Sequence, residues 1–128
     1  MLQQTLSGSV RFISLDRNEL VAALRAIAER IGAEQSAVKA VRLFGSLARG
    51  EQTGTSDVDV LIVLKLGTVG SAMERIRRFH AYFDLPLAVD VLVYAEDQIA
   101  QRLQAGDPFL ARVWAESRVL WPASSLEW

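Results

Sequence analysis

The sequence predicts an α/β domain in which a mixed central sheet is flanked by helices. Segments with helical spacing of apolar residues alternate along the chain with apolar runs of strand length. Two of these runs, 57–64 and 87–94, are nearly continuously apolar, as is typical of strands covered on both faces. Of the 128 residues, 51% are hydrophobic and 23% charged. We therefore expect a single globular domain over residues 1–128.

The first predicted elements are a short strand over Val10–Ser14 and an amphipathic helix. Asp16 begins this helix, because Glu19 three residues later completes a capping box. The apolar residues of the helix recur at helical spacing: Leu20, Val21, Leu24, Ile27, Ala28 and Ile31. We expect Gly32 to end it.

The central part of the chain is predicted to form two strands and two helices. A strand over Val38–Phe44 precedes a short helix over Ser46–Arg49. The run Asp57–Leu64 predicts a strand at the centre of the sheet, and Lys65–Gly70 a loop. The next helix spans Ser71–Phe83, with four residues expected near one face: Met73, Ile76, His80 and Phe83.

The remaining predicted elements are a buried strand, two helices and a last short strand, over Leu87–Tyr94, Glu96–Gln104, Pro108–Glu116 and Arg118–Trp121. Asp107 is the expected N-cap of the second helix, because Pro108 then takes the first helical position. Pro122 ends the last strand.

Composition limits the classes of function. No run approaches the length of a membrane-spanning helix, and residues 1–9 lack the layout of a signal peptide, so we expect a cytoplasmic protein with no membrane partner. The absence of cysteine excludes thiolate metal sites. A net charge of −1 makes direct nucleic-acid binding an unfavoured function.

The most informative feature is a fixed spacing of polar residues around the predicted central strands. Gly45 and Ser46 follow one apolar strand, and Asp57 and Asp59 begin the next. Carboxylates at positions i and i+2 of a strand point to the same face, where they are costly unless they are neutralised. Mg²⁺ suits such oxygen ligands, and a Gly-Ser turn offers N–H groups and a hydroxyl to a phosphate. The pattern therefore predicts a metal–phosphate site.

Residues 43–50 (Leu-Phe-Gly-Ser-Leu-Ala-Arg-Gly) and 56–63 (Ser-Asp-Val-Asp-Val-Leu-Ile-Val), with Asp90 in a later apolar run, resemble a known pattern. It is that of the nucleotidyltransferase superfamily related to DNA polymerase beta, in particular its short prokaryotic branch, the minimal nucleotidyltransferases. The matching block covers residues 41–64 and the strand that holds Asp90. The resemblance implies the polymerase beta-like nucleotidyltransferase palm fold.

The resemblance also implies roles for the three aspartates. Asp57 and Asp59 would hold two Mg²⁺ ions that bridge the phosphates of a nucleoside triphosphate. Asp90 would complete the metal site and accept the proton of the attacking hydroxyl. The alternatives are that Asp57 and Asp59 are exposed carboxylates at the start of a strand, and that Asp90 pairs with a neighbouring arginine.

Gly45 and Ser46 would bind the β- and γ-phosphates, and the alternative for them is an ordinary turn. Arg49 could reach a phosphate or pair with Glu51, and the sequence favours neither interpretation. Ser56 is better explained as a turn residue than as a ligand.

Other chemically distinctive residues have simpler explanations. His80, the only histidine, is more typical of packing or of the surface than of catalysis. Three arginines predict a solvated helix face, with an RNA or acidic partner as the alternative: Arg75, Arg77 and Arg78. Three tryptophans indicate core and C-terminal packing: Trp114, Trp121 and Trp128.

The acceptor of the transferred nucleotide is the least determined part of this prediction. The chain has no evident segment for an acceptor site, and the resemblance implies a protein acceptor, with AMP moved from ATP to a tyrosine of a helical HEPN-domain toxin partner. The chain would then be an antitoxin. Two alternatives stay open: a non-catalytic binding antitoxin, and a transferase for a small molecule or RNA assisted by a second subunit. The apolar segment Val119–Trp128 could bind a partner, or cover the sheet of its own subunit or of a homodimer.

Overall fold

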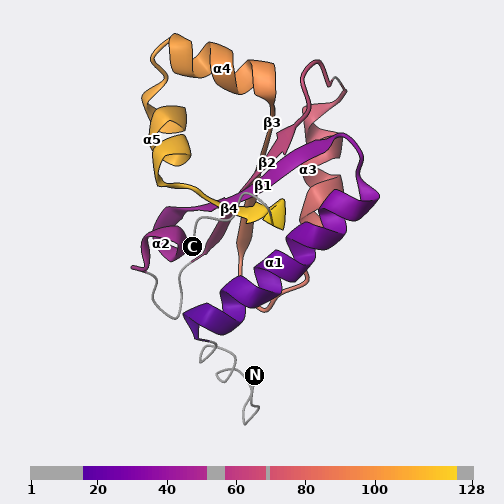
Figure 1. The fold of residues 1–128 in the computed structure, drawn as a ribbon, viewed down its shortest axis with the longest axis vertical. Helices are drawn as coiled ribbons and strands as arrows, with labels where there is room; N and C mark the ends of the chain where they lie inside the picture. The colour runs from indigo at the N-terminus through magenta and orange to yellow at the C-terminus, as the bar shows by residue number, and fades with distance from the viewer. Residues whose placement is uncertain (1–15, 52–56, 69, 124–128) are drawn as a thin grey trace.

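The computed structural model, which describes residues 16–51, 57–68 and 70–123, has a four-stranded sheet with helices on both faces (Figure 1). The strands are β1 (Val38–Phe44), β2 (Val58–Leu64), β3 (Val89–Ala95) and β4 (Arg118–Trp121), in the order β3-β2-β1-β4. The β2–β3 pair is parallel, and β1 is antiparallel to both β2 and β4. The predicted mixed sheet is thus confirmed.

Helices α1 (Arg17–Glu34) and α3 (Ala72–His80) pack on one face of the sheet. Helices α4 (Glu96–Gln104) and α5 (Pro108–Glu116) cover the other face, and the short α2 (Gly45–Arg49) directly follows β1 (Figure 1). In the described ranges no helix combines the length and the apolar character needed to cross a lipid bilayer.

The pleat of the central strand divides the core into two clusters. In β2, Val60 and Ile62 point toward α1 and α3, whereas Leu61 and Val63 point toward α4 and α5. Five of the last six residues of β2 are fully covered, which confirms its predicted central position. Because side chains alternate, Asp59 shares the α4/α5 face with Leu61.

Several predicted elements have the observed boundaries. Val38–Phe44, Glu96–Gln104 and Arg118–Trp121 form the strand, helix and strand expected of them. The capping box of Asp16 and Glu19 is present at the start of α1. Asp107 caps α5 by accepting hydrogen bonds from the amides of Phe109 and Leu110 at 3.0 and 3.1 Å. The predicted strand Val10–Ser14 lies outside the described residues.

Gly32 does not end α1, as the sequence predicted, because the helix continues to Glu34. A Cβ atom at Gly32 would overlap the indole ring of Trp121 on β4. The glycine therefore allows close packing of α1 against the sheet. The same contact shows that Trp121, with buried Val119 and Leu120, covers its own subunit. Residues 124–128 of the proposed partner segment, including Trp128, lie outside the described part.

The prediction of which residues form the apolar face of α3 is also partly wrong. Met73 and His80 are exposed, whereas Phe79 and Phe83 are buried and Ile76 is partly buried. The helix ends at His80, and the turn that follows it brings Phe83 into the core. The residues that face the core are thus Ile76, Phe79 and Phe83. They recur at spacings of three and four residues, like the predicted face, but that face was predicted to begin at Met73. Of the three arginines predicted to form a solvated helix face, Arg77 and Arg78 are exposed, whereas Arg75 is partly buried and donates a hydrogen bond to Gly70 O at 3.1 Å.

Candidate functional site

Two of the three predicted aspartates meet on adjacent parallel strands. Asp59 of β2 and Asp90 of β3 are partners in the strand register, and their side chains are hydrogen bonded to each other. Both occupy the strand positions that face α4 and α5. Asp57 precedes β2 by one residue and is exposed, close enough to act electrostatically on Asp59. The sheet therefore gathers the predicted carboxylates at the start of β2 and β3.

This arrangement is unfavourable for a charged Asp59. The pKa of Asp59 is raised from 3.8 to about 6, by burial foremost and then by the charges of Asp90 and Asp57. The hydrogen bond with Asp90 and the charge of Glu116 add smaller contributions. Asp59 is thus a half-buried carboxyl that shares its surroundings with three other acidic groups.

The Gly45 turn lies against Asp59. In the antiparallel β1–β2 ladder Phe44 pairs with Asp59, so the chain leaves β1 beside the carboxylates. Gly45 has φ +80°, in the left-handed region that favours glycine, and a Cβ atom there would overlap Asp59 Oδ2. Only glycine lets the backbone approach the carboxylate this closely. Ser46 is half-buried in the first turn of α2.

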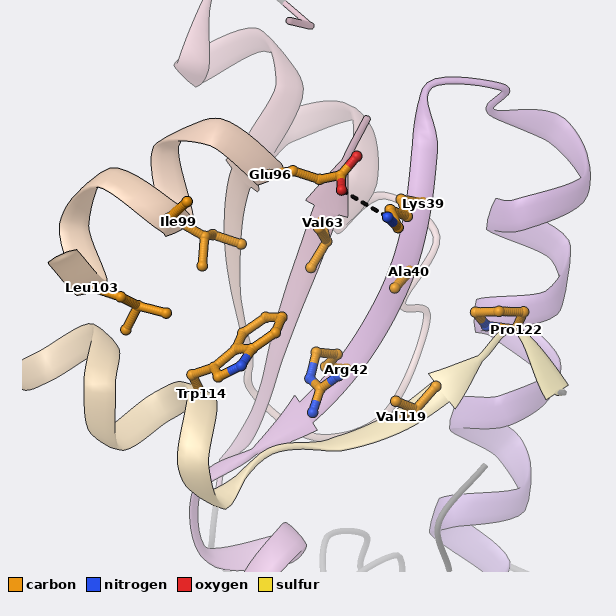
Figure 2. Close-up of a pocket in the computed structure, with 11 residues that line it drawn as sticks. Lys39, Ala40, Arg42, Val63, Glu96, Ile99, Leu103, Trp114, Val119 and Pro122 are labelled. Carbon is orange, nitrogen blue, oxygen red and sulfur yellow. Dashed lines mark hydrogen bonds and ion pairs between the residues drawn. The ribbon is translucent and has the colours of Figure 1, made fainter. Parts of the chain in front are cut away.

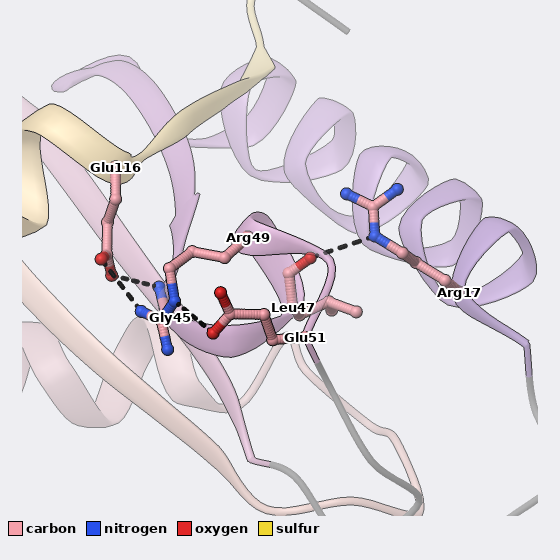
Figure 3. A network of polar contacts seen from close by, with 6 residues as sticks. All are labelled: Arg17, Gly45, Leu47, Arg49, Glu51 and Glu116. Atoms are coloured by element: carbon pink, nitrogen blue, oxygen red, sulfur yellow. Dashed lines mark hydrogen bonds and ion pairs between the residues drawn. The ribbon is translucent and has the colours of Figure 1, made fainter.

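Glu116, at the end of α5, engages two of the predicted phosphate-binding groups at once (Figure 3). Its carboxylate accepts a hydrogen bond from Gly45 N at 2.8 Å and one from Arg49 Nη1 at 2.9 Å. Arg49 also pairs with Glu51 at 3.0 Å, and these two carboxylates, Glu51 foremost, raise the pKa of the Arg49 side chain. The predicted Arg49–Glu51 pair is therefore present. Arg17 Nε donates to Leu47 O at 3.1 Å and ties α2 to α1.

A cavity of about 510 Å³ opens over this cluster. It is lined by predicted residues together with a row from α5: Phe44, Gly45, Arg49, Asp59, Phe109, Arg112, Val113 and Glu116. Asp57 and Asp90 are not among its lining residues. Phe109, Arg112 and Glu116 were not among the site residues predicted from the sequence. Their spacing, i, i+3 and i+7, places them on one face of a predicted helix, but only the packing of α5 shows that this face meets the site.

The metal prediction has partial geometric support. Within the described ranges no three acidic or histidine side chains converge closely enough to form a complete metal site. The donor chemistry fits a hard divalent cation, since two carboxylates touch and a third adds negative charge nearby. The alternative was that Asp90 pairs with an arginine; its side chain is instead hydrogen bonded to Asp59, and among the described residues no ion pair joins it to an arginine.

A second cavity, of about 460 Å³, lies farther along the same face of the sheet (Figure 2). Its lining is mostly apolar and includes Val63, Ile99 and Trp114, with the Lys39–Glu96 ion pair at 2.7 Å beside it. The Arg42 guanidinium lies 4.4 Å from the ring centroid of Trp114 and donates to Ser117 Oγ at 2.7 Å. This cavity shares no lining residue with the one over Asp59.

Comparison with solved structures shows the class of fold. A protein from Sulfolobus solfataricus described as a putative nucleotidyltransferase superposes with a TM-score of 0.61 at 20% identity, covering 86% of each chain. A toxin–antitoxin structure with AMP-PNP has a TM-score of 0.48 at 19% identity, over 85% of this chain and 75% of the other. A structure of the MntA-HpeT toxin–antitoxin has a TM-score of 0.47 at 18% identity, over 86% of this chain and 75% of the other. The mixed sheet with flanking helices is that of nucleotidyltransferases.

The family follows from the sequence. The model of the nucleotidyltransferase domain family matches residues 24–120, which include β1, β2, β3, all but the last residue of β4, and the cluster around Asp59. The chain therefore belongs to the nucleotidyltransferase domain family. Curated protein sequences give no significant match.

Proposed function

We propose that the chain transfers a nucleoside monophosphate, AMP from ATP, to a hydroxyl group with Mg²⁺ as cofactor. The observation that carries the proposal is the pairing of Asp59 with Asp90 beside the Gly45 turn, next to an open cavity. Membership of the nucleotidyltransferase domain family supports nucleotidyl transfer as the reaction class.

The acceptor oxygen bonds to the α-phosphorus, the bond from that phosphorus to the bridging oxygen breaks, and pyrophosphate leaves. The three aspartates would hold Mg²⁺, which would supply positive charge at the phosphates. Asp90 accepts the proton of the acceptor hydroxyl. Gly45 N–H, Ser46 and Arg49 hold the β- and γ-phosphates in place of the Glu116 carboxylate.

ATP is expected to bind only when Mg²⁺ is present, because the carboxylate cluster alone repels a triphosphate. Calorimetric titration of ATP in Mg²⁺ and in EDTA measures this. At a ligand concentration 100 times Kd, binding should stabilise the protein by about 2.7 kcal/mol in Mg²⁺ and not in EDTA. Equal affinity in both solutions, or no binding in either, contradicts the proposal.

Replacing Glu116 with Gln is expected to tighten ATP binding by about 10-fold. The substitution removes the negative charge of Glu116, which competes with the phosphates of ATP for the hydrogen-bond donors of Gly45 and Arg49. Glu51→Gln is the matched control, since it removes a partner of Arg49 but none of Gly45. Calorimetry with both variants should show a clearly smaller effect for Glu51→Gln. An unchanged or weaker affinity of Glu116→Gln would show that Glu116 does not compete with phosphate.

The acceptor we propose is a hydroxyl on a HEPN-type toxin partner, so that the chain acts as an antitoxin. The support is the resemblance of residues 41–64 to minimal nucleotidyltransferases. Co-expression with the product of the adjacent reading frame, followed by pull-down and intact mass measurement, tests it. We expect a stable complex whose partner gains one or more AMP masses. A complex without added mass indicates a binding antitoxin, and transfer to a small molecule or RNA instead contradicts the protein acceptor.

A further inference from the structure

Helix α5 presents an aromatic ring and a cation to the cavity over Asp59. Phe109 is 46% exposed and lines this cavity, whereas the other large apolar residues that are exposed in the described part of the chain, Leu66 and Met73, line neither this cavity nor the one beside Trp114. Leu110 and Val113 on the same helix are buried. The exposure of Phe109 is therefore a property of one face of α5, the face that meets the site.

Arg112 lies one turn farther along the same face. It is exposed and lines the cavity, and among residues 16–51, 57–68 and 70–123 the structure gives its guanidinium no hydrogen bond or ion pair. Glu116, four residues on, is engaged by Gly45 and Arg49. A guanidinium beside a cavity and without a bound carboxylate is suited to an anionic ligand.

The three α5 side chains lie in a chemically ordered row. From Phe109 to Glu116 the helix rises by about 10 Å. The ring of Phe109 lies at one end of this row and the guanidinium of Arg112 in the middle. At the other end, around Glu116, lie Gly45 N–H and the Arg49 guanidinium, hydrogen-bond donors that suit a phosphate. An extended nucleotide has the same order, with a planar base, then a phosphate next to the ribose, then the terminal phosphates.

We propose that Phe109 stacks on the nucleobase and that Arg112 binds the phosphate next to the ribose, so that α5 forms the base-binding wall of the site. The inference rests on the proposed nucleotidyl transfer. Base–aromatic stacking tolerates any base, because every base has a π-face. The Asp107 cap holds the first turn of α5 and hence the backbone of Phe109, which positions the ring before a nucleotide binds.

The test compares two probes, ATP and inorganic triphosphate, by calorimetry in Mg²⁺. Phe109→Ala should weaken ATP binding by about 10-fold and leave triphosphate binding unchanged, since only ATP has a base. Phe109→Leu keeps an apolar side chain without a π-face and should show the same loss. Arg112→Gln should weaken the binding of both ATP and inorganic triphosphate. Met73→Ala, which removes an exposed apolar side chain elsewhere, is the control and should change neither.

The outcomes separate this inference from the proposed function. If the wild-type protein binds neither probe in Mg²⁺, the proposed function and the inference both fail. If it binds both, and Phe109→Ala keeps the wild-type ratio of the two affinities, only the base-binding role of α5 is overturned. Equal loss of both probes in Phe109→Leu, with an unchanged melting temperature, also overturns it, because the ring would then not act on the base.

Discussion

Replacing Asp59 with Asn should reduce nucleotidyl transfer by roughly 1,000-fold or more, because the variant loses a proposed ligand of the Mg²⁺ whose positive charge would offset the triphosphate in the transition state. Asp59 is the predicted metal ligand that lies deepest in the site, in contact with Asp90 and beside Gly45. Release of labelled pyrophosphate from ATP, or labelling of the acceptor, measures the loss. Asp84→Asn, at an exposed carboxylate outside the cavity, is the control for the lost charge.

The same variant should be more stable than the wild type in EDTA at high pH. The folded-state pKa of Asp59, about 6, lies above its ordinary value of 3.8, so folding favours the protonated form. Stability of the wild type therefore falls as the pH rises between these two values, and Asn removes that loss. The full pKa difference corresponds to about 3 kcal/mol. Solvent screening around a partly exposed group reduces this to about 1 kcal/mol.

Thermal unfolding in EDTA across this pH range tests the stability effect. The Asp59→Asn melting temperature should exceed that of the wild type above about pH 6 and approach it near pH 3.8. Near wild-type transfer by Asp59→Asn would overturn the assigned role of Asp59. A lower melting temperature for the variant at high pH would show that the charged carboxylate is stabilised by contacts within the fold.

Replacing Gly45 with Ala should abolish transfer and also destabilise the fold. The left-handed backbone costs an alanine roughly 1–2 kcal/mol, and the overlap of its Cβ with Asp59 Oδ2 adds roughly 1–3 kcal/mol. Relief of the overlap moves either the turn or the Asp59 carboxylate. Both shifts separate the backbone that we propose to bind phosphate from the proposed metal ligand. Chemical denaturation gives the stability change, and the transfer assay the loss of activity.

Gly50 offers a matched control for the backbone contribution. It has φ +76°, close to the +80° of Gly45, but no atom lies within 4 Å of the Cβ position there. Gly50→Ala should therefore lose only the stability that the left-handed backbone costs an alanine, and should keep wild-type nucleotidyl transfer. The difference between the two variants measures the overlap with Asp59. Equal destabilisation in both would show that the close approach of Gly45 to Asp59 has no energetic consequence.

Local patterns in the sequence determined much of the fold. Alternation, capping and proline position depend on residues a few positions apart, so they predicted β1, α4, α5 and β4 with the observed boundaries. The spacing of Gly45, Asp57 and Asp59 predicted that these residues lie close together, as the structure shows, because they flank one antiparallel strand pair. These features need no knowledge of the strand order.

Only the tertiary structure decided which distant groups meet. The pairing of Asp90 with Asp59 requires β3 to lie parallel to β2 in a given register, and Glu116 reaches Gly45 only because α5 packs over the end of β1. Gly32 was misread as a helix end because its partner, Trp121, lies 89 positions away in the chain. Such contacts leave no periodicity in the sequence, since they depend on how the strands are ordered and on which helix covers which face of the sheet.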